Sequence, residues 1–268
     1  MKSVTVEPGS RKNVTKSNDL VMAAYKLTLN EQRLLLAAIS QIDPRKPMPR
    51  PISITAQDFS EQYGIPLKHA YEALKEATSV LYERDIKTFD GRYKSRFRWV
   101  DRVDYLDGGG ETKLFFTVHV QPYLVHLNQR FTTYELKRIA DLTSTHSIRL
   151  FELLQQFRST GFYRVSVAEF RELLELGPSY ERYSNLKLKV IDPAIAELRE
   201  KSGLLVELKT ENLGGNAVTW ALKRDGKEIA LSDALTGELS AEGGTVMFKE
   251  KGAYTLTVSI TDALGKAS

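Results

Sequence analysis

The 268-residue chain contains no cysteine, no long hydrophobic run and no apolar leader. The absence of cysteine excludes disulfides and thiolate metal sites, and it is typical of a protein from a reducing compartment. No run approaches the roughly 18–20 apolar residues that are needed to span a bilayer. The first 20 residues are polar and lack the apolar centre of a secretory signal. We therefore expect a cytoplasmic protein without a membrane partner.

Motifs of catalysis and of metal binding are also missing. The four histidines, at positions 69, 119, 126 and 146, include no pair separated by one residue, as a two-histidine nickase site would require. The sequence has no phosphate-binding G-x-x-x-x-G-K-[ST] motif and no zinc-binding H-E-x-x-H motif. The sequence therefore predicts a protein that is not an enzyme and that needs no cofactor and no metal.

Positive charge is concentrated in the first four-fifths of the chain. The net charge is +4, but residues 211–268 hold six basic and eight acidic side chains, a net of −2, so residues 1–210 carry +6. A basic body favours a polyanionic partner such as nucleic acid. A solvated basic surface without a partner is the alternative that charge alone leaves open.

Residues 141–161 carry the strongest local signal. A Ser/Thr cluster opens an apolar-periodic helix at residues 145–157, Gly161 ends it, and a strand at residues 162–167 leads into a helix at residues 167–176. Residues 57–86 have the same order of parts. This order is that of a winged helix, so the sequence predicts two winged-helix domains in tandem, which points to DNA binding.

The first predicted domain begins with a capping box, because Thr28 is followed three residues later by Glu31. Its outer helix, at residues 67–83, directs Ala70, Leu74, Ala77 and Leu81 inward. The other expected elements are a strand at residues 52–54, a helix at residues 59–63 ending at Gly64, and strands at residues 93–106 and 113–120 joined by a turn at residues 107–110.

The second predicted domain contains a helix at residues 134–140 and a long helix at residues 185–201. In the long helix we expect Leu188, Ile191, Ile195 and Leu198 to face inward. Pro193 is tolerated only within about the first turn of a helix, so this helix either begins near Asp192 or kinks there. A wing strand follows at residues 204–209.

The tail differs from the rest, because apolar and polar residues alternate in short runs separated by turns. This pattern predicts a small antiparallel β-sandwich over residues 214–268. Residues 214–224 could be the last strand of the second wing or the first strand of the sandwich, which suggests a fusion junction near residues 210–226. The expected class is α+β, with a flexible arm at residues 1–17, winged helices at 18–131 and 132–213, and the β segment at 214–268.

The helix that starts near Arg182 is the expected recognition helix of the second domain, because the second helix of a helix-turn-helix enters the major groove. Its cations suit phosphate or guanine, its Asn suits adenine, and its hydroxyl groups suit phosphate. These candidate contacts are Arg182, Tyr183, Ser184, Asn185, Lys187 and Lys189. A solvated helix face is the alternative for each residue taken singly.

The start of the helix at residues 145–157 is a second candidate site. Its free backbone N–H groups and dipole favour an anion, with Ser144, His146 and Arg149 as the phosphate contacts. The hydroxyl groups could equally form only a helix cap. Arg149 could equally form an internal ion pair with Glu152 or Glu135.

In the first domain, the outer face of the helix at residues 67–83 carries Lys68, His69 and Lys75. A predicted wing strand at residues 92–99 alternates basic and aromatic side chains. Its basic side, suited to a phosphate backbone, comprises Arg92, Lys94, Arg96 and Arg98, and its aromatic side comprises Tyr93, Phe97 and Trp99. We expect the aromatic side to pack in the core, with stacking on single-stranded bases as the alternative.

Residues 18–224 resemble the replication initiator (Rep) proteins of iteron-containing plasmids, which have two winged helices. The matching blocks are NDLVMAAYKLTLNEQRLLLAAISQI, the DFSEQYGI…AYEALKEATSVLYERDI region, YELKRIADLTSTHSIRLFELLQQF and YSNLKLKVIDPAIAELREKSGLLVEL. Residues 214–268 are similar instead to bacterial immunoglobulin-like or PKD-like modules.

The resemblance to initiators implies that monomers bind repeats in double-stranded origin DNA and that homodimers repress the operator of their own gene. It places the dimer interface in the first winged helix, with residues 113–120 as candidates, and it implies host replication proteins as further partners. Two alternatives stay open: a winged-helix transcriptional regulator without a role in replication, and a surface or virion protein whose immunoglobulin-like tail is the working part.

Overall fold

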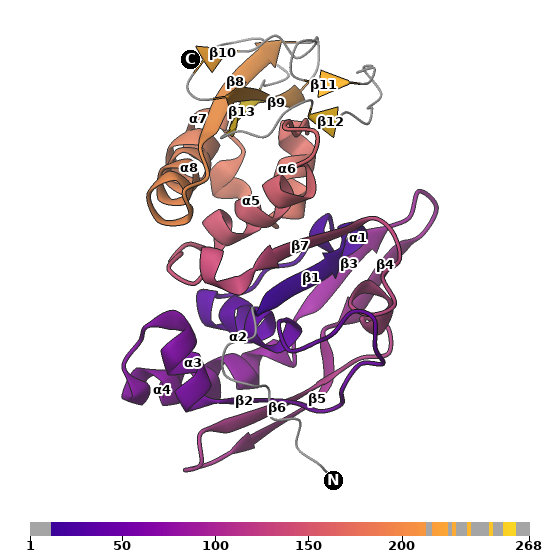
Figure 1. The fold of residues 1–268 in the computed structure, drawn as a ribbon, viewed down its shortest axis with the longest axis vertical. Helices are drawn as coiled ribbons and strands as arrows, with labels where there is room; N and C mark the ends of the chain where they lie inside the picture. Colours follow the sequence, from indigo (N-terminus) through magenta and orange to yellow (C-terminus); the bar gives the residue numbers. More distant parts are fainter. Residues whose placement is uncertain are drawn as a thin grey trace. The chain divides into compact units, whose positions relative to one another are not determined.

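The computed structural model describes the backbone of residues 12–212, 216–224, 227–228, 235–236, 247–248 and 254–260, and side chains up to residue 208. The chain divides into two units, Met1–Thr145 and His146–Ser268, each with its own helices and sheet (Figure 1). Among the helices described, none is both long enough and apolar enough to cross a bilayer.

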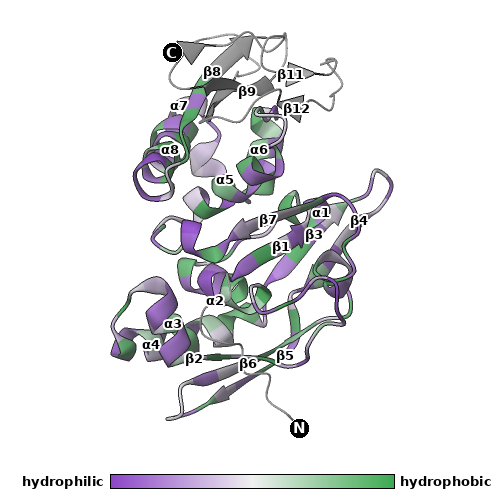
Figure 2. Cartoon of the chain, viewed as in Figure 1, coloured by the Kyte–Doolittle hydropathy of each residue, from purple (hydrophilic) through white to green (hydrophobic). Residues whose placement is uncertain are grey.

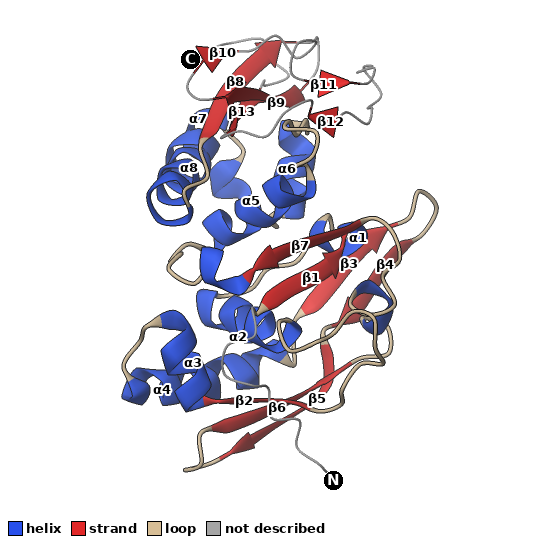
Figure 3. Cartoon of the chain, viewed as in Figure 1, coloured by secondary structure: helices blue, strands red, loops and turns tan. Residues whose placement is uncertain are grey.

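The first unit mixes short sheets and helices (Figure 3). Its elements are β1 (Asn13–Ser17), α1 (Asn18–Val21), α2 (Leu29–Ile39), β2 (Ile52–Thr55), α3 (Ala56–Tyr63), α4 (Leu67–Leu81), β3 (Asp85–Phe89), β4 (Lys94–Arg98), β5 (Val100–Leu106), β6 (Glu111–Phe116), the 3-10 turn η1 (Gln121–Tyr123), β7 (Phe131–Glu135) and the 3-10 turn η2 (Leu136–Arg138).

The N-terminal segment and the region before residue 140 differ from the prediction. Asn13–Ser17 are not part of a mobile arm, because they pair antiparallel with Phe131–Glu135, from Asn13 opposite Glu135 to Ser17 opposite Phe131. Residues 1–11 lie outside the described residues. The helix predicted at residues 134–140 is wrong: alternating burial of Thr132 and Tyr134 marks a strand, which a 3-10 turn follows.

The helix-turn-helix of the first unit confirms the local prediction. Capping boxes at Thr28 and Thr55 start α2 and α3, with the Thr28 hydroxyl accepting from the Glu31 N–H. Gly64, at φ +61°, ends α3 in the left-handed conformation that glycine adopts without strain. Along α4 the predicted residues Ala70, Leu74, Ala77 and Leu81 are all buried, while hydrophilic residues occupy much of its opposite face (Figure 2).

The wing of the first unit is the antiparallel sheet β2–β6–β5, with its turn at residues 107–110. The strand predicted at residues 93–106 divides into β4 and β5 at Trp99, which is fully buried and forms a T-shaped contact with Tyr25 at a centroid distance of 5.1 Å. β4 pairs with β3 in a separate hairpin, so residues 92–99 are not the wing strand. Tyr93, predicted to face the core, is 58% exposed at the tip of that hairpin.

The second unit is helical first and then β (Figure 3). Its elements are α5 (Thr145–Gln156), α6 (Val167–Leu173), the 3-10 turn η3 (Pro178–Tyr180), α7 (Tyr183–Leu186), the π turn η4 (Lys187–Ile191), α8 (Asp192–Glu197), the π turn η5 (Leu198–Ser202), β8 (Val206–Asn212), β9 (Asn216–Arg224), β10 (Lys227–Glu228), β11 (Leu235–Thr236), β12 (Met247–Phe248) and β13 (Tyr254–Ile260). The strand predicted at residues 162–167 is wrong, since only Val165 forms a β-bridge there.

A continuous helix from Tyr183 to Ser202 combines α7, η4, α8 and η5. It neither begins at Asp192 nor stops at Pro193, because the wide turn η4 precedes the proline, with the Asp192 N–H donating to the Lys187 carbonyl five residues back. A π turn inserted in an α-helix changes the phase of the residues beyond it. The predicted inward face is wrong at Leu188, which lies inside this turn and is 67% exposed.

The buried positions of this helix recur every four residues, a longer repeat than the 3.6 residues per turn of an α-helix. They are Leu186, Val190, Ala194 and Leu198, with Ile191 buried beside them. The predicted inward residues Ile191 and Leu198 are therefore confirmed, whereas Ile195 is only half-buried.

The wing of the second unit is the antiparallel pair β8–β9, from Leu208 opposite Trp220 to Asn212 opposite Asn216. β9 also pairs with β13, from Val218 opposite Ile260 to Arg224 opposite Tyr254. One strand therefore serves both the wing and the tail, since a strand has two edges. The remainder of residues 214–268 lies largely outside the described residues, and the immunoglobulin-like fold there stays a prediction.

Candidate nucleic-acid interface

The turn between α6 and α7 is held by Arg171. Its Nε donates to the Tyr180 carbonyl at 2.8 Å, and its Nη2 donates to the Glu181 carbonyl. A charged donor on two carbonyl oxygens fixes the angle at which the chain enters the recognition helix. Arg171 was not identified from the sequence. Its partners are backbone carbonyl groups nine and ten residues later, and no sequence pattern predicts such contacts.

The predicted recognition residues of the second unit lie together on the first half of the helix from Tyr183 to Ser202. Arg182, Ser184 and Lys189 are exposed, whereas Tyr183, Asn185 and Lys187 are half-buried. Lys189 forms no ion pair with any other residue whose side chain is described. This end of the helix therefore presents polar and cationic groups to solvent while Leu186 and Val190 anchor it to the core.

Two of these side chains already have partners. The Asn185 Nδ2 donates to the Ser179 carbonyl at 3.2 Å, so its amide is engaged within the turn. The Lys187 Nζ lies 2.6 Å from the Asp192 Oδ2, with the two side chains 43% and 45% exposed. Exposed ion pairs contribute little, so Lys187 can exchange Asp192 for a phosphate at small cost.

Arg149 is the clearest correction at the start of α5. Its Nη1 lies 3.2 Å from the Glu152 Oε2, and the two side chains are 5% and 0% exposed. A buried pair of this kind is costly to break, because removing one partner leaves an uncompensated charge. Arg149 therefore forms the internal ion pair and not the phosphate contact, while Ser144 and His146 are half-buried at the first turn.

In the first unit, α4 exposes Lys68, His69 and Lys75 as predicted. His69 lies 3.4 Å from Glu72 on the same helix. The Lys75 Nζ lies 3.0 Å from the Asp107 Oδ1 on the wing turn, and this hydrogen bond raises the pKa of Lys75. The wing turn thus places the Asp107 carboxylate within hydrogen-bonding distance of Lys75, a candidate DNA contact.

The same turn approaches α4 closely at Gly110. A Cβ atom at this position would lie 1.9 Å from the Tyr71 Cε1, and the glycine has φ +60°. A side chain here would therefore be both strained and obstructed. The absence of a side chain at Gly110 therefore allows the wing turn to lie close against the Tyr71 ring of α4.

The basic residues of β4 are partly neutralised by acids of the same hairpin region. Arg96 forms an ion pair with Asp85, and the Arg98 Nη2 lies 2.6 Å from the Glu83 Oε2. The Arg92 guanidinium lies over the Tyr93 ring, 5.0 Å from its centroid. Lys94 is exposed and forms no ion pair among the described side chains, so it is the freest cation of this set.

We expect Asp107→Asn to strengthen DNA binding by the full chain about two- to fivefold at low salt. The change frees Lys75 and removes a negative charge from the helix face, and the gain should vanish as salt screens both charges. Fluorescence anisotropy over a salt series measures it. Asp43→Asn is the matched control, because Asp43 pairs with Arg45 in the proline-rich loop and its loss should leave affinity unchanged.

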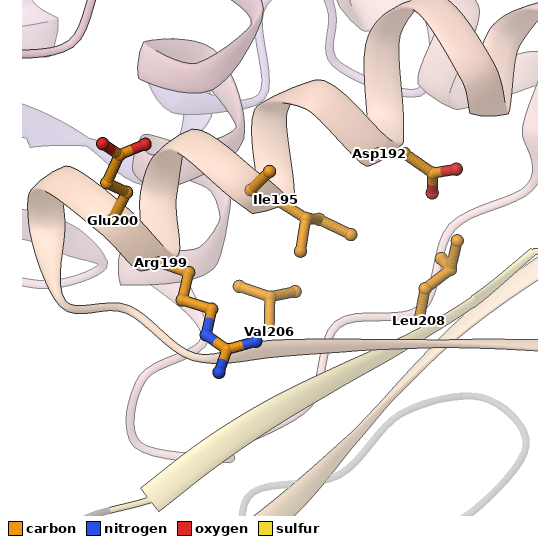
Figure 4. A pocket seen from close by; sticks show the side chains of 7 residues that line it. Asp192, Ile195, Arg199, Glu200, Val206 and Leu208 are labelled. Carbon is orange, nitrogen blue, oxygen red and sulfur yellow. The ribbon is translucent and has the colours of Figure 1, made fainter.

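A groove of about 570 Å³ separates the α8–η5 segment from β8. Ile195 faces Val206 and Leu208 across it, and Arg199 reaches from the helix toward the strand (Figure 4). The groove therefore lies between the first wing strand and the C-terminal half of the helix from Tyr183 to Ser202. Within the described part of the chain, no three His, Asp or Glu side chains cluster as metal ligands.

Comparisons with known proteins agree with this geometry. The family model "Initiator Replication protein, WH1" matches residues 13–155, and "Initiator Rep protein, WH2" matches residues 166–222. A replication initiation protein of Escherichia coli is 25% identical over 202 residues, covering 71% of this chain. The PI protein of Escherichia coli is 23% identical over 236 residues, covering 74% of this chain and 77% of that protein.

The chain spans 63% of the length of the first of these relatives. Among solved structures, the crystal structure of the Pi initiator protein in complex with iteron DNA is similar to this fold. Its TM-score is 0.64 at 20% sequence identity, and the superposition covers 95% of this chain and 99% of that one. The likeness shows the fold, that of two winged-helix domains in one chain.

Proposed function

The chain belongs to the family of replication initiators built from WH1 and WH2 domains, and we propose that it starts the replication of a plasmid by binding repeats in double-stranded origin DNA. The observation that carries this proposal is the helix from Tyr183 to Ser202, whose exposed end holds Arg182, Ser184 and Lys189. A helix of this composition, entering the major groove with its N-terminal half, reads bases and neutralises phosphates. The Pi initiator, a protein of the same fold, is bound to iteron DNA in its crystal structure.

The first unit contributes a second contact in this proposal. Lys68 and Lys75 on α4, together with Lys94 on the β3–β4 hairpin, neutralise phosphates and position the protein without reading sequence. Two winged helices on one chain then bind one repeat as a monomer. Two modules joined by one chain also raise affinity through the effective concentration of the second module.

Homodimers bind an inverted repeat at the protein's own operator and repress the gene. The dimer forms through the first unit. β6 is hydrogen-bonded on both edges, to β2 and to β5, so it offers side chains and not backbone groups to a partner. Val118 and His119, which follow β6 and are exposed, are the most accessible residues of the interface proposed at residues 113–120.

Initiation in this proposal requires no catalysis by the chain itself. The binding free energy and the assembly of several copies on adjacent repeats destabilise the neighbouring A·T-rich duplex, and host replication proteins then enter. The protein acts in the cytoplasm, with no cofactor and no metal.

A mobility-shift titration of the full chain on the origin of its own plasmid tests the proposal. We expect a sequence-preferring complex with the repeats that weakens steeply as salt rises, and a much weaker complex with a shuffled duplex of the same composition. Equal binding to both duplexes at every salt concentration would contradict it. Loss of plasmid replication when the gene is deleted separates an initiator from a regulator.

A further inference from the structure

Leu188 is the most exposed large hydrophobic side chain among the residues whose side chains are described, at 67%. It lies in η4, in the half of the helix that the proposed function places in the major groove. A single exposed leucine is common on soluble proteins, so the inference depends on where Leu188 lies and on which residues surround it.

The outward position of Leu188 is built into the helix. Leu186 and Val190, two residues before and after it, are both buried, and the wide turn that ends with the Asp192 N–H donating to the Lys187 carbonyl sets this phase. A side chain between two buried neighbours of the same turn cannot rotate into the core without unwinding the turn. Leu188 is therefore held on the solvent side.

The neighbours of Leu188 determine what it can meet. Lys187 and Lys189 flank it in the chain, and the exposed Ser184 precedes it by one turn. Cations on both sides favour a polyanion over an apolar protein surface. In the major groove of DNA, the apolar group that a side chain meets is the C5-methyl group of thymine.

We propose that Leu188 contacts a thymine methyl group and thereby determines the preference of this chain for thymine at one position of its DNA site. The proposal rests on the proposed DNA-binding function and adds to it an apolar contact that the polar candidates cannot make. Lys187 and Lys189 hold the backbone phosphates on either side, which brings the leucine to the base edge.

Uracil substitution tests the contact, because uracil lacks only the methyl group. A duplex selected by the full chain from a random pool is the probe, and each thymine in turn is replaced by uracil. We expect the affinity of the wild-type protein to fall about fourfold when one particular thymine is replaced. A loss of about fourfold is what removal of one methyl group from an apolar contact produces. Leu188→Ala should bind the thymine duplex more weakly by a similar factor and should not respond to uracil at that position.

Leu205→Ala is the matched control, because Leu205 is a second exposed leucine of the same unit, at 43%. This variant should keep the full response to uracil. Because both side chains are exposed, both variants should unfold at the temperature of the wild type. A complex that responds to uracil at no thymine, or a Leu188→Ala variant that keeps the response, overturns the role of Leu188 while the function stands. Failure to select any duplex overturns the proposed function itself.

Discussion

Replacing Lys187 and Lys189 together with alanine should weaken binding of the full chain to its origin DNA by about 10- to 100-fold at ~0.1 M salt and flatten the salt dependence. Each phosphate contact contributes about 0.9 to the slope of log K against log salt. Lys189 has no competing ion pair among the described side chains, and Lys187 is held only by an exposed pair with Asp192. The slope should therefore fall by about 2 when both contacts are lost. Anisotropy titrations over a salt series measure the slope and the affinity together.

The control for this change removes the same charge from the other end of the same helix. Arg199→Ala with Lys201→Ala takes away two cations, one of which pairs with Glu197 at 2.9 Å. We expect this pair of substitutions to lower affinity only slightly, through the general loss of positive charge. Equal losses in the two double variants would show that net charge, and not the recognition half of the helix, carries the binding.

Replacing Glu31 with alanine should lower the free energy of unfolding of the first unit by about 2–4 kcal/mol. The Glu31 side chain is fully buried and accepts from the Thr28 N–H at 2.6 Å and from the Arg84 Nε at 2.7 Å. Its loss removes the capping box of α2 and leaves Arg84, 32% exposed, without this carboxylate. The variant therefore destabilises the unit from inside, through a residue that is not itself a proposed DNA contact.

The two tryptophans, at positions 99 and 220, allow the first unit to be followed alone. In a Trp220→Phe background, the fully buried Trp99 reports the unfolding of the first unit in urea. Glu31→Gln should be intermediate, because its amide oxygen still accepts one hydrogen bond. Glu76→Ala, on the exposed face of α4, should change stability by less than about 0.5 kcal/mol. If Glu31→Ala lowers the free energy of unfolding no more than Glu76→Ala does, the buried carboxylate does not stabilise the unit.

Local signals in the sequence were sufficient for the helix-turn-helix elements and for the family. The capping boxes at Thr28 and Thr55 and the left-handed Gly64 act between residues that are at most four positions apart, so they can be seen in the chain itself. The inward face of α4 follows from its period alone. The prediction of two winged helices in a member of the replication initiator family is confirmed.

Part of the candidate site also followed from the sequence. Arg182, Ser184 and Lys189 are exposed on one helix, as their spacing implied. Their contacts with DNA remain predictions. The intramolecular partners that compete for Asn185 and Lys187 were not visible in the spacing, because the first partner is a backbone carbonyl and the second depends on the course of the helix around Pro193.

The linear pattern determined the helix-turn-helix elements of the first unit and their caps, because these depend on neighbours along the chain. Tertiary structure alone decided that Asn13–Ser17 pair with Phe131–Glu135 and that Asp107 reaches Lys75. It also turned Leu188 outward. Each of these outcomes depends on contacts across the fold or on the phase of a π turn, and neither is encoded in the spacing of residues that are close in sequence.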